Sequence, residues 1–224
     1  MVEDLEYCIT WSKFDCRNLL LPEIEPEYTS KVSDKYLREY MQVKNGIAKW
    51  INPNRICEIG VSSGISALAF LDACPNAEYV GIDNRFEEQM RDVQLVDRAI
   101  ELLKSYKAKV HILDSQELGK LPDGPFDMVH VDGCHTKEAT YHDVILAWNA
   151  LLPGGWIVVD DAKDSAVACG TFEALLVARQ GNCEWLYLEN SWTGNILIHK
   201  EETWETYNRL EGKDGLSAAN RNRR

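Results

Sequence analysis

Four residues in the second half of the chain have side chains that could bind a cation and move a proton. Asp132 ends one predicted strand and Asp160 ends the next; Asp161 follows directly, and His135 lies three residues beyond Asp132. Three converging carboxylates repel one another, and a hard divalent cation such as Mg²⁺ or Mn²⁺ removes that penalty through oxygen ligands. A neutral imidazole near pH 7 could then take the proton of a hydroxyl group. Alternatively, the paired aspartates only begin a loop and cap a helix.

A glycine-bearing segment after an earlier predicted strand could approach a ligand with its backbone. The segment runs Glu58-Ile-Gly60-Val-Ser62-Ser-Gly64. Glycines there allow close approach because no side chain intervenes. The wide Gly-x-x-x-Gly spacing matches the dinucleotide fingerprint GxGxxG poorly, which disfavours an NAD-dependent oxidoreductase. Alternatively, the glycines merely turn a strand into a helix.

Polar residues also end the next two predicted strands. Asp83 ends the second strand, about 20 residues after the glycine segment, where a carboxylate commonly binds ribose hydroxyls. Asp114 and Ser115 end the third strand and could bind the amino group of adenine. Each aspartate could instead cap the helix that follows it. Together, the three strand ends predict a nucleoside site.

Alternating strands and helices are expected to position these residues. Such alternation predicts an α/β fold of the Rossmann-like kind: a mainly parallel seven-stranded sheet with helices on both faces and an antiparallel C-terminal hairpin. Ligands bind at the carboxyl ends of such strands, where the strand order reverses. The expected strands are 55–59, 77–82, 109–113, 126–131, 156–159, 184–188 and 195–199, and the main helices are 64–74, 86–104, 136–151 and 165–179.

The chain divides into a central domain and two flanking segments. Residues 1–50 are expected to form an irregular extension followed by a helix from about residue 34. This segment could cover the site as a lid, contact another subunit or simply pack on the domain. Residues 51–200 form the cofactor-binding domain, and residues 201–224 a C-terminal helix and a disordered tail.

Composition limits the partners and the compartment. A formal net charge of −12 argues against nucleic-acid binding, which needs a basic face. The 7 cysteines lack CxxC pairs, which favours reduced thiols in the cytoplasm. No apolar run approaches the roughly 20 residues that cross a bilayer, and the N-terminus shows no signal pattern. We therefore expect a cytoplasmic protein with a small-molecule substrate, no membrane partner and a possible homo-oligomeric assembly.

The order of these motifs resembles the class I S-adenosylmethionine (SAM)-dependent methyltransferases over about residues 55–200. The matching segments are Glu-x-Gly-x-x-x-Gly64, Gly-Ile-Asp83, Asp114-Ser, Phe126-Asp-Met-Val-His-Val-Asp132 and Leu152-Pro-Gly-Gly155. The resemblance implies a SAM-dependent enzyme. Its cofactor-binding residues would be Glu58, Gly60, Ser62, Gly64, Asp83, Asp114, Ser115 and Asp132.

Within this superfamily, Val131-Asp-Gly-Cys-His135 and Val159-Asp-Asp161 resemble the metal-dependent O-methyltransferases of antibiotic deoxysugars. This narrower resemblance implies methyl transfer to a hydroxyl of a sugar or another natural-product intermediate. Its catalytic base would be His135, and Mg²⁺ or Mn²⁺ would bind Asp132, Asp160 and Asp161. Two alternatives remain open: a catechol-type O-methyltransferase, whose usual Asn is replaced here by Asp161, and a non-catalytic SAM-fold binding protein.

Overall fold

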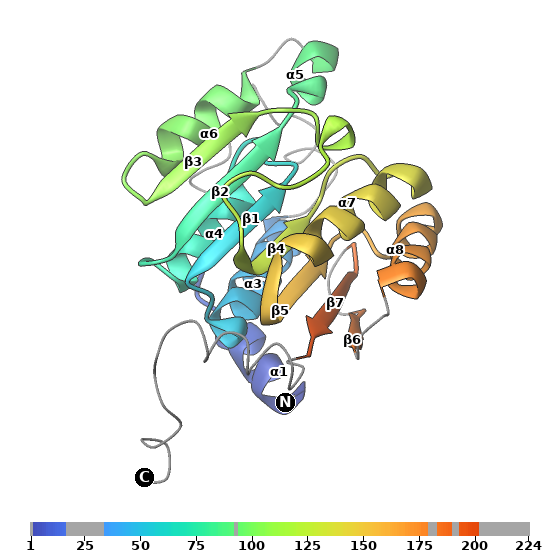
Figure 1. Cartoon of the computed structure of the whole chain (residues 1–224). Coiled ribbons are helices and arrows are strands. Elements are labelled where there is room, and N and C mark those ends of the chain that lie inside the picture. The colour runs from blue at the N-terminus through green and yellow to red at the C-terminus, as the bar shows by residue number, and fades with distance from the viewer. Residues whose placement is uncertain (1, 17–33, 92–93, 179–182, 190–192, 202–224) are drawn as a thin grey trace, which may run out of the picture.

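The computed structural model describes residues 2–16, 34–91, 94–178, 183–189 and 193–201. Within these ranges the chain forms one seven-stranded sheet with the order β3-β2-β1-β4-β5-β7-β6 (Figure 1). The first five strands run parallel, and β7 is antiparallel to both β5 and β6. The predicted fold class is confirmed. The strands are β1 (Arg55–Ile59), β2 (Glu78–Asp83), β3 (Ala108–Ile112), β4 (Phe126–Val131), β5 (Leu151–Val159), β6 (Cys183–Leu188) and β7 (Asn195–Lys200).

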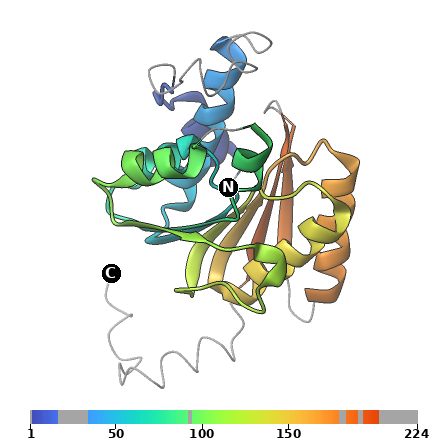
Figure 2. The same cartoon turned by 90° about the horizontal axis from the view of Figure 1, so that it is seen from above.

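Helices cover both faces of the sheet (Figure 2). One face carries α3, α4 and α6, with α1 packed on α3; the other face carries α7 and α8. The helices are α1 (Val2–Thr10), α3 (Asp34–Ile51), α4 (Ile65–Ala73), α5 (Phe86–Arg91), α6 (Leu95–Leu103), α7 (Lys137–Ala150), α8 (Ser165–Ala178) and the short 3₁₀ helix η2 (Ser115–Glu117). In the described part of the chain, no helix is long and apolar enough to span a membrane.

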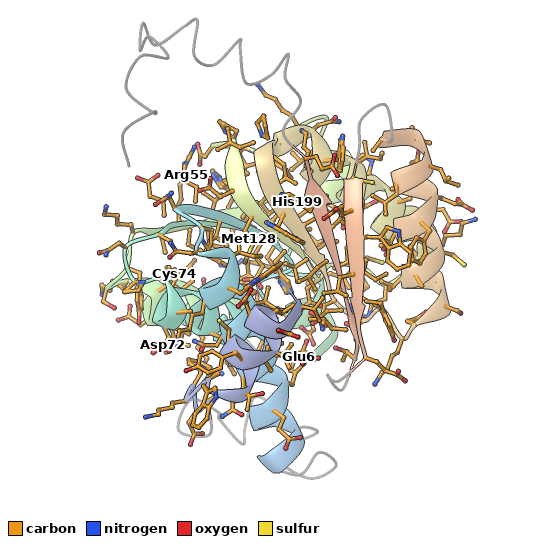
Figure 3. The ribbon with its side chains drawn as sticks, turned by 90° about the horizontal axis from the view of Figure 1, so that it is seen from below. Glu6, Arg55, Asp72, Cys74, Met128 and His199 are labelled. Carbon is orange, nitrogen blue, oxygen red and sulfur yellow. The ribbon has the colours of Figure 1, made fainter. Side chains whose placement is uncertain are left out.

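Strand side chains alternate between the two faces, and this alternation decides where the polar residues point. On β4, Met128 packs in the apolar cluster under α3 and α4, whereas Val129 packs in the cluster under α7. By the same alternation, His130 and the following Asp132 point toward α3. Figure 3 views the molecule from this side, with α1 and α3 in front of the sheet and Met128 among the labelled residues.

Three elements differ from the sequence-based expectations. The extension was expected to be irregular, but it begins with the helix α1. The apolar side of α1 packs on α3 and buries Leu5. The helix expected at 86–104 is broken into α5 and α6, with residue 94 preceding the second helix. The fifth strand begins at residue 151 rather than 156. The helix and tail expected at 201–224 fall, beyond residue 201, outside the described residues.

Candidate active site

The strand order reverses between β1 and β4, and the candidate site lies at the carboxyl ends of these strands. In the described sheet, β2 and β3 lie to one side of β1, while β4 and β5 lie to the other. This reversal is where open α/β sheets bind ligands. All five parallel strands end at the same edge of the sheet (Figure 1). The glycine segment, Asp83, Asp132 and Asp160 are gathered there because each ends or follows one of these strands.

The glycine segment forms a tight turn between β1 and α4. Gly60 has φ +87°, and a Cβ atom added to it would lie 1.9 Å from the carbonyl oxygen of Asp132. Gly64 has φ +80°, and its added Cβ would lie 2.8 Å from Cβ of Ala99 on α6. Both positions therefore require glycine on conformational and steric grounds. The turn is held directly against the end of β4, so a ligand over the turn also faces Asp132.

Asp83 organises this turn from the end of β2. Its Oδ2 accepts hydrogen bonds from the backbone N–H groups of Val61 and Ser62, at 3.0 and 2.9 Å. Its Oδ1 accepts from the N–H of Arg85 at 2.7 Å. The Ser62 hydroxyl donates to Glu87 Oε2 at 2.9 Å. Asp83 is only partly buried, so its carboxylate both fixes the turn and faces the edge.

A pocket of about 370 Å³ opens beside the ends of β2 and β3. Asp114 has two roles here: its Oδ1 caps η2 through the Gln116 N–H at 2.9 Å, and the residue lines the pocket. Exposed Ile112 and Leu113 add apolar surface. Apolar walls with a few polar groups suit a planar base such as adenine. The lining residues are Asn84, Phe86, Gln89, Ile112, Leu113 and Asp114.

A buried carboxylate on α7, Asp143, was not singled out from the sequence and contacts η2. Asp143 accepts a hydrogen bond from Nε2 of Gln116 at 2.9 Å. Its Oδ2 is buried and has no hydrogen-bond partner among the described residues. Burial raises the pKa of Asp143 to about 6. Because its amide nitrogen is engaged by Asp143, Gln116 is held in one orientation next to Ser115.

Glu58 lies in the interior rather than at the ligand-facing edge. Its side chain is fully buried on the α3 side of the sheet. Oε1 lies 2.8 Å from Nδ1 of His130, and Oε2 accepts a hydrogen bond from the Tyr79 hydroxyl. The alternation along β1 explains this, because Cys57 and Ile59 face α7 and Glu58 must face the opposite way. Both carboxylate oxygens are thus used within the protein.

Asp160 is also surrounded by protein donors. Its side chain is 0% exposed. Oδ2 accepts from the Tyr40 hydroxyl and from Lys44 Nζ, the latter at 2.5 Å. Oδ1 accepts from the Asp161 N–H (2.9 Å), the Thr193 hydroxyl (2.6 Å) and Asn195 Nδ2 (3.3 Å). A carboxylate offers about four lone-pair sites, and the contacts to Oδ1 and Oδ2 together occupy them.

Lys44 on α3 lies in the candidate site and was not singled out by sequence reasoning. Its ammonium group is buried and lies 2.9 Å from His130 Nε2, 3.3 Å from Asp132 Oδ2 and 2.5 Å from Asp160 Oδ2. Burial alone would lower the pKa of Lys44, but Asp160 and Asp132 outweigh it and hold the pKa above its usual value. The available signal was its position one turn from Tyr40 and from Ile47, on the buried side of the helix.

Among the described residues, the three aspartates expected to bind a metal are divided between two groups of candidate ligands. Among the described residues, His130, Asp132 and Asp160 form one group whose ligand atoms lie close enough for a metal ion. All three of these residues contact Lys44 Nζ. The other such group joins Asp132 and Asp161 with His135 and leaves Asp160 out. The backbone explains this separation, because Asp161 has φ +52° and its side chain turns toward His135.

His135 lies at the open side of the cluster, 49% exposed. Its Nε2 is 3.2 Å from Asp161 Oδ2 and 3.8 Å from Asp132 Oδ1. Interaction with Asp132, and then the negative charge of Asp161, raise the pKa of His135 to about 9. Burial, with the charges of Asp160 and Asp132, raises the pKa of Asp161 to about 7. The imidazole expected to be neutral near pH 7 is therefore protonated there in the free protein.

Sequence comparisons with known proteins find similar methyltransferases. A family profile described as a methyltransferase domain matches residues 57–162. The O-methyltransferase ankF of Aspergillus thermomutatus is 27% identical over 173 residues, covering 70% of this chain and 69% of the relative.

Two solved structures share the fold. The methyltransferase PaMTH1 of Podospora anserina, bound to S-adenosylhomocysteine, has a TM-score of 0.59 at 21% identity, covering 88% of this chain and 93% of its own. The O-methyltransferase TomG of Streptomyces achromogenes, in complex with SAM, has a TM-score of 0.59 at 18% identity, covering 90% and 96%. The predicted resemblance to class I SAM-dependent O-methyltransferases is confirmed.

Proposed function

We propose that this protein transfers the methyl group of SAM to a hydroxyl oxygen of a small molecule, a sugar or another natural-product intermediate. One observation carries the proposal: the Gly60 turn packs on the backbone of Asp132, three residues before His135. A nucleoside site and a proton-accepting group therefore share one edge of the sheet. The relatives support the same reaction, since ankF is named an O-methyltransferase and TomG is described as acting in tomaymycin synthesis.

The cofactor and its site suit each other chemically. SAM supplies a methyl group on a sulfonium, and the electron pair of the breaking carbon–sulfur bond stays on sulfur. The Asp83 carboxylate, already fixed by backbone N–H groups, is placed for ribose hydroxyls. The pocket at Asn84, Leu113 and Asp114 is placed for adenine. The turn from Gly60 to Gly64 lets the backbone approach the rest of the SAM molecule.

His135 is the proposed proton acceptor. As the acceptor oxygen forms its bond to the methyl carbon, its proton passes to the imidazole. Asp161 Oδ2, 3.2 Å from Nε2, orients the ring and stabilises the imidazolium that results. Because the pKa of His135 is about 9, the ring must lose a proton before it can act, and turnover should rise with pH.

The narrower expectations have uneven support. Binding of Mg²⁺ or Mn²⁺ by Asp132, Asp160 and Asp161 together is disfavoured, because protein donors already occupy both carboxylate oxygens of Asp160. The deoxysugar and catechol alternatives differ in the methyl acceptor. A non-catalytic SAM-binding protein would not need the His135–Asp161 pair.

The proposal is tested with methyl-labelled SAM and a panel containing a nucleotide deoxysugar, a catechol and a simple phenol. The expected result is labelled product from at least one acceptor and a loss of about 100-fold or more in His135→Gln. His199→Gln is the matched control, because His199 stacks on Trp156 at the opposite edge of the sheet (Figure 3). Failure of the wild-type protein to bind S-adenosylhomocysteine in calorimetry, or equal turnover of both variants, would contradict the proposal.

A further inference from the structure

We propose that Lys44 is the resident cation of this site: its ammonium group takes the place of a divalent metal among His130, Asp132 and Asp160, so that methyl transfer proceeds without bound metal. The part of this inference that concerns methyl transfer rests on the proposed function. The position of the positive charge can nevertheless be tested without a methyl-accepting substrate. Lys44 acts through Asp132 and Asp160, which makes it a positioning residue.

The hydrogen-bond count is the first support. An ammonium group has three N–H donors and no lone pair. Lys44 Nζ has three acceptors, His130 Nε2, Asp132 Oδ2 and Asp160 Oδ2. These are the three residues of one candidate metal group. A metal ion among them would have to displace the ammonium from a fully used set of contacts.

Charge and burial are the second support. Lys44 is 1% exposed and the Asp160 side chain 0% exposed, so neither charge is screened well by water. Removing one partner of a buried ion pair leaves the other charge buried and unpaired, which is strongly unfavourable. The Tyr40 ring lies 4.7 Å from Nζ and adds a favourable contact to the ammonium. Lys44 therefore supplies a fixed positive charge between Asp132 and Asp160, where the two carboxylates would otherwise repel each other.

The environment of His130 is the third support. Since Lys44 can only donate, Nε2 of His130 must accept, and the proton of the neutral ring lies on Nδ1. That N–H donates to Glu58 Oε1 at 2.8 Å, and Glu58 also accepts from Tyr79. The chain Tyr79–Glu58–His130–Lys44 is thus consistent in every donor and acceptor. It fixes the ammonium from the interior of the sheet.

The test measures Mn²⁺ binding by the loss of the free-ion signal in electron paramagnetic resonance. Wild-type protein should bind no Mn²⁺ at micromolar concentrations, and EDTA should leave its affinity for SAM and its turnover unchanged. Lys44→Met, which keeps the side-chain length and removes the charge, should bind Mn²⁺ on the order of tenfold or more tightly, because two carboxylates and an imidazole are released. Lys49→Met, on an exposed position of the same helix, should behave as wild type.

A second variant covers the case in which Lys44→Met does not fold. Lys44→Met combined with Asp160→Asn removes both charges of the buried pair, and it should fold and bind no Mn²⁺. Micromolar Mn²⁺ binding by the wild-type protein, loss of turnover in EDTA, or a folded Lys44→Met variant with no gain in Mn²⁺ binding would overturn the inference. Failure to bind SAM would instead contradict the proposed function, so failure of the Lys44 inference and failure of the proposed function are distinguishable.

Discussion

Replacing Asp83 with alanine tests the cofactor site through a residue whose structural and binding roles can be separated. In the free protein its carboxylate accepts hydrogen bonds from the N–H groups of Val61, Ser62 and Arg85. In the complex it is also proposed to bind the ribose hydroxyls. Asp83→Ala should therefore loosen the turn and weaken SAM binding together.

The magnitude follows from hydrogen bonds to a charged group, each worth about 1.5–3 kcal/mol. Loss of one such bond to ribose corresponds to about ten- to one-hundred-fold weaker SAM binding, since about 1.4 kcal/mol is tenfold. Val61 is buried, whereas Ser62 and Arg85 are partly exposed, so water can replace only part of the lost bonds. We expect a loss of about 1–3 kcal/mol in the free energy of unfolding.

Asp127 provides the matched control. Its Oδ2 accepts from two successive N–H groups, Asn54 at 2.9 Å and Arg55 at 2.8 Å, at the start of β1 and thus at the opposite edge of the sheet. Asp127→Ala should lower stability by a similar amount and leave SAM affinity unchanged. Calorimetric titration with SAM and urea unfolding measure the two quantities. The reasoning is refuted if Asp83→Ala binds SAM as wild type does, or if both variants lose affinity equally.

Three further predictions concern other parts of the site. The rate of methyl transfer should rise with pH up to about pH 9, because His135 must be deprotonated to accept a proton, and a profile that is flat or falls over this range would exclude it as the base. Asp143→Asn should stabilise the protein above about pH 6. Because the pKa of Asp143 in the folded protein is about 6 and its usual value is about 3.9, the wild type loses stability as the buried carboxyl ionises between these two pH values. Urea unfolding at both ends of that range checks this, and an unchanged difference between variant and wild type would contradict it. Gly60→Ala should destabilise by about 2 kcal/mol or more, because φ is +87° and the new Cβ would lie 1.9 Å from a carbonyl oxygen. Gly119→Ala, where nothing lies within 4 Å, should change unfolding little, and equal effects of the two substitutions would contradict the steric argument.

The sheet and its polar edge could be predicted from sequence because both follow from local patterns. Short apolar runs at regular spacing indicate parallel strands, and parallel strands end at one edge. Asp83, Asp114, Asp132 and Asp160 each come at or directly after such a run, so their placement at the edge required no knowledge of packing.

The partners of these residues could not be predicted, since they depend on which face each side chain meets. Glu58 was expected to bind cofactor, but the alternation along β1 turns it toward α3 and into contact with His130. Lys44 lies 88 positions from Asp132 and 116 from Asp160 along the chain. Nothing in the local sequence of a helix states which strand end it will cover. The carboxylates at the strand ends could therefore be predicted from the sequence, whereas the ammonium group that α3 places between Asp132 and Asp160 could not.

A crystal structure of the protein grown with S-adenosylhomocysteine and Mn²⁺ tests the central claim most directly. The account predicts the cofactor over the turn from Gly60 to Gly64, with its ribose at Asp83 and its sulfur facing the side of the edge that carries His135. It also predicts Lys44 Nζ between Asp132 and Asp160, with no anomalous manganese signal at that position. Cofactor bound elsewhere, or a manganese peak between those two carboxylates, would contradict it.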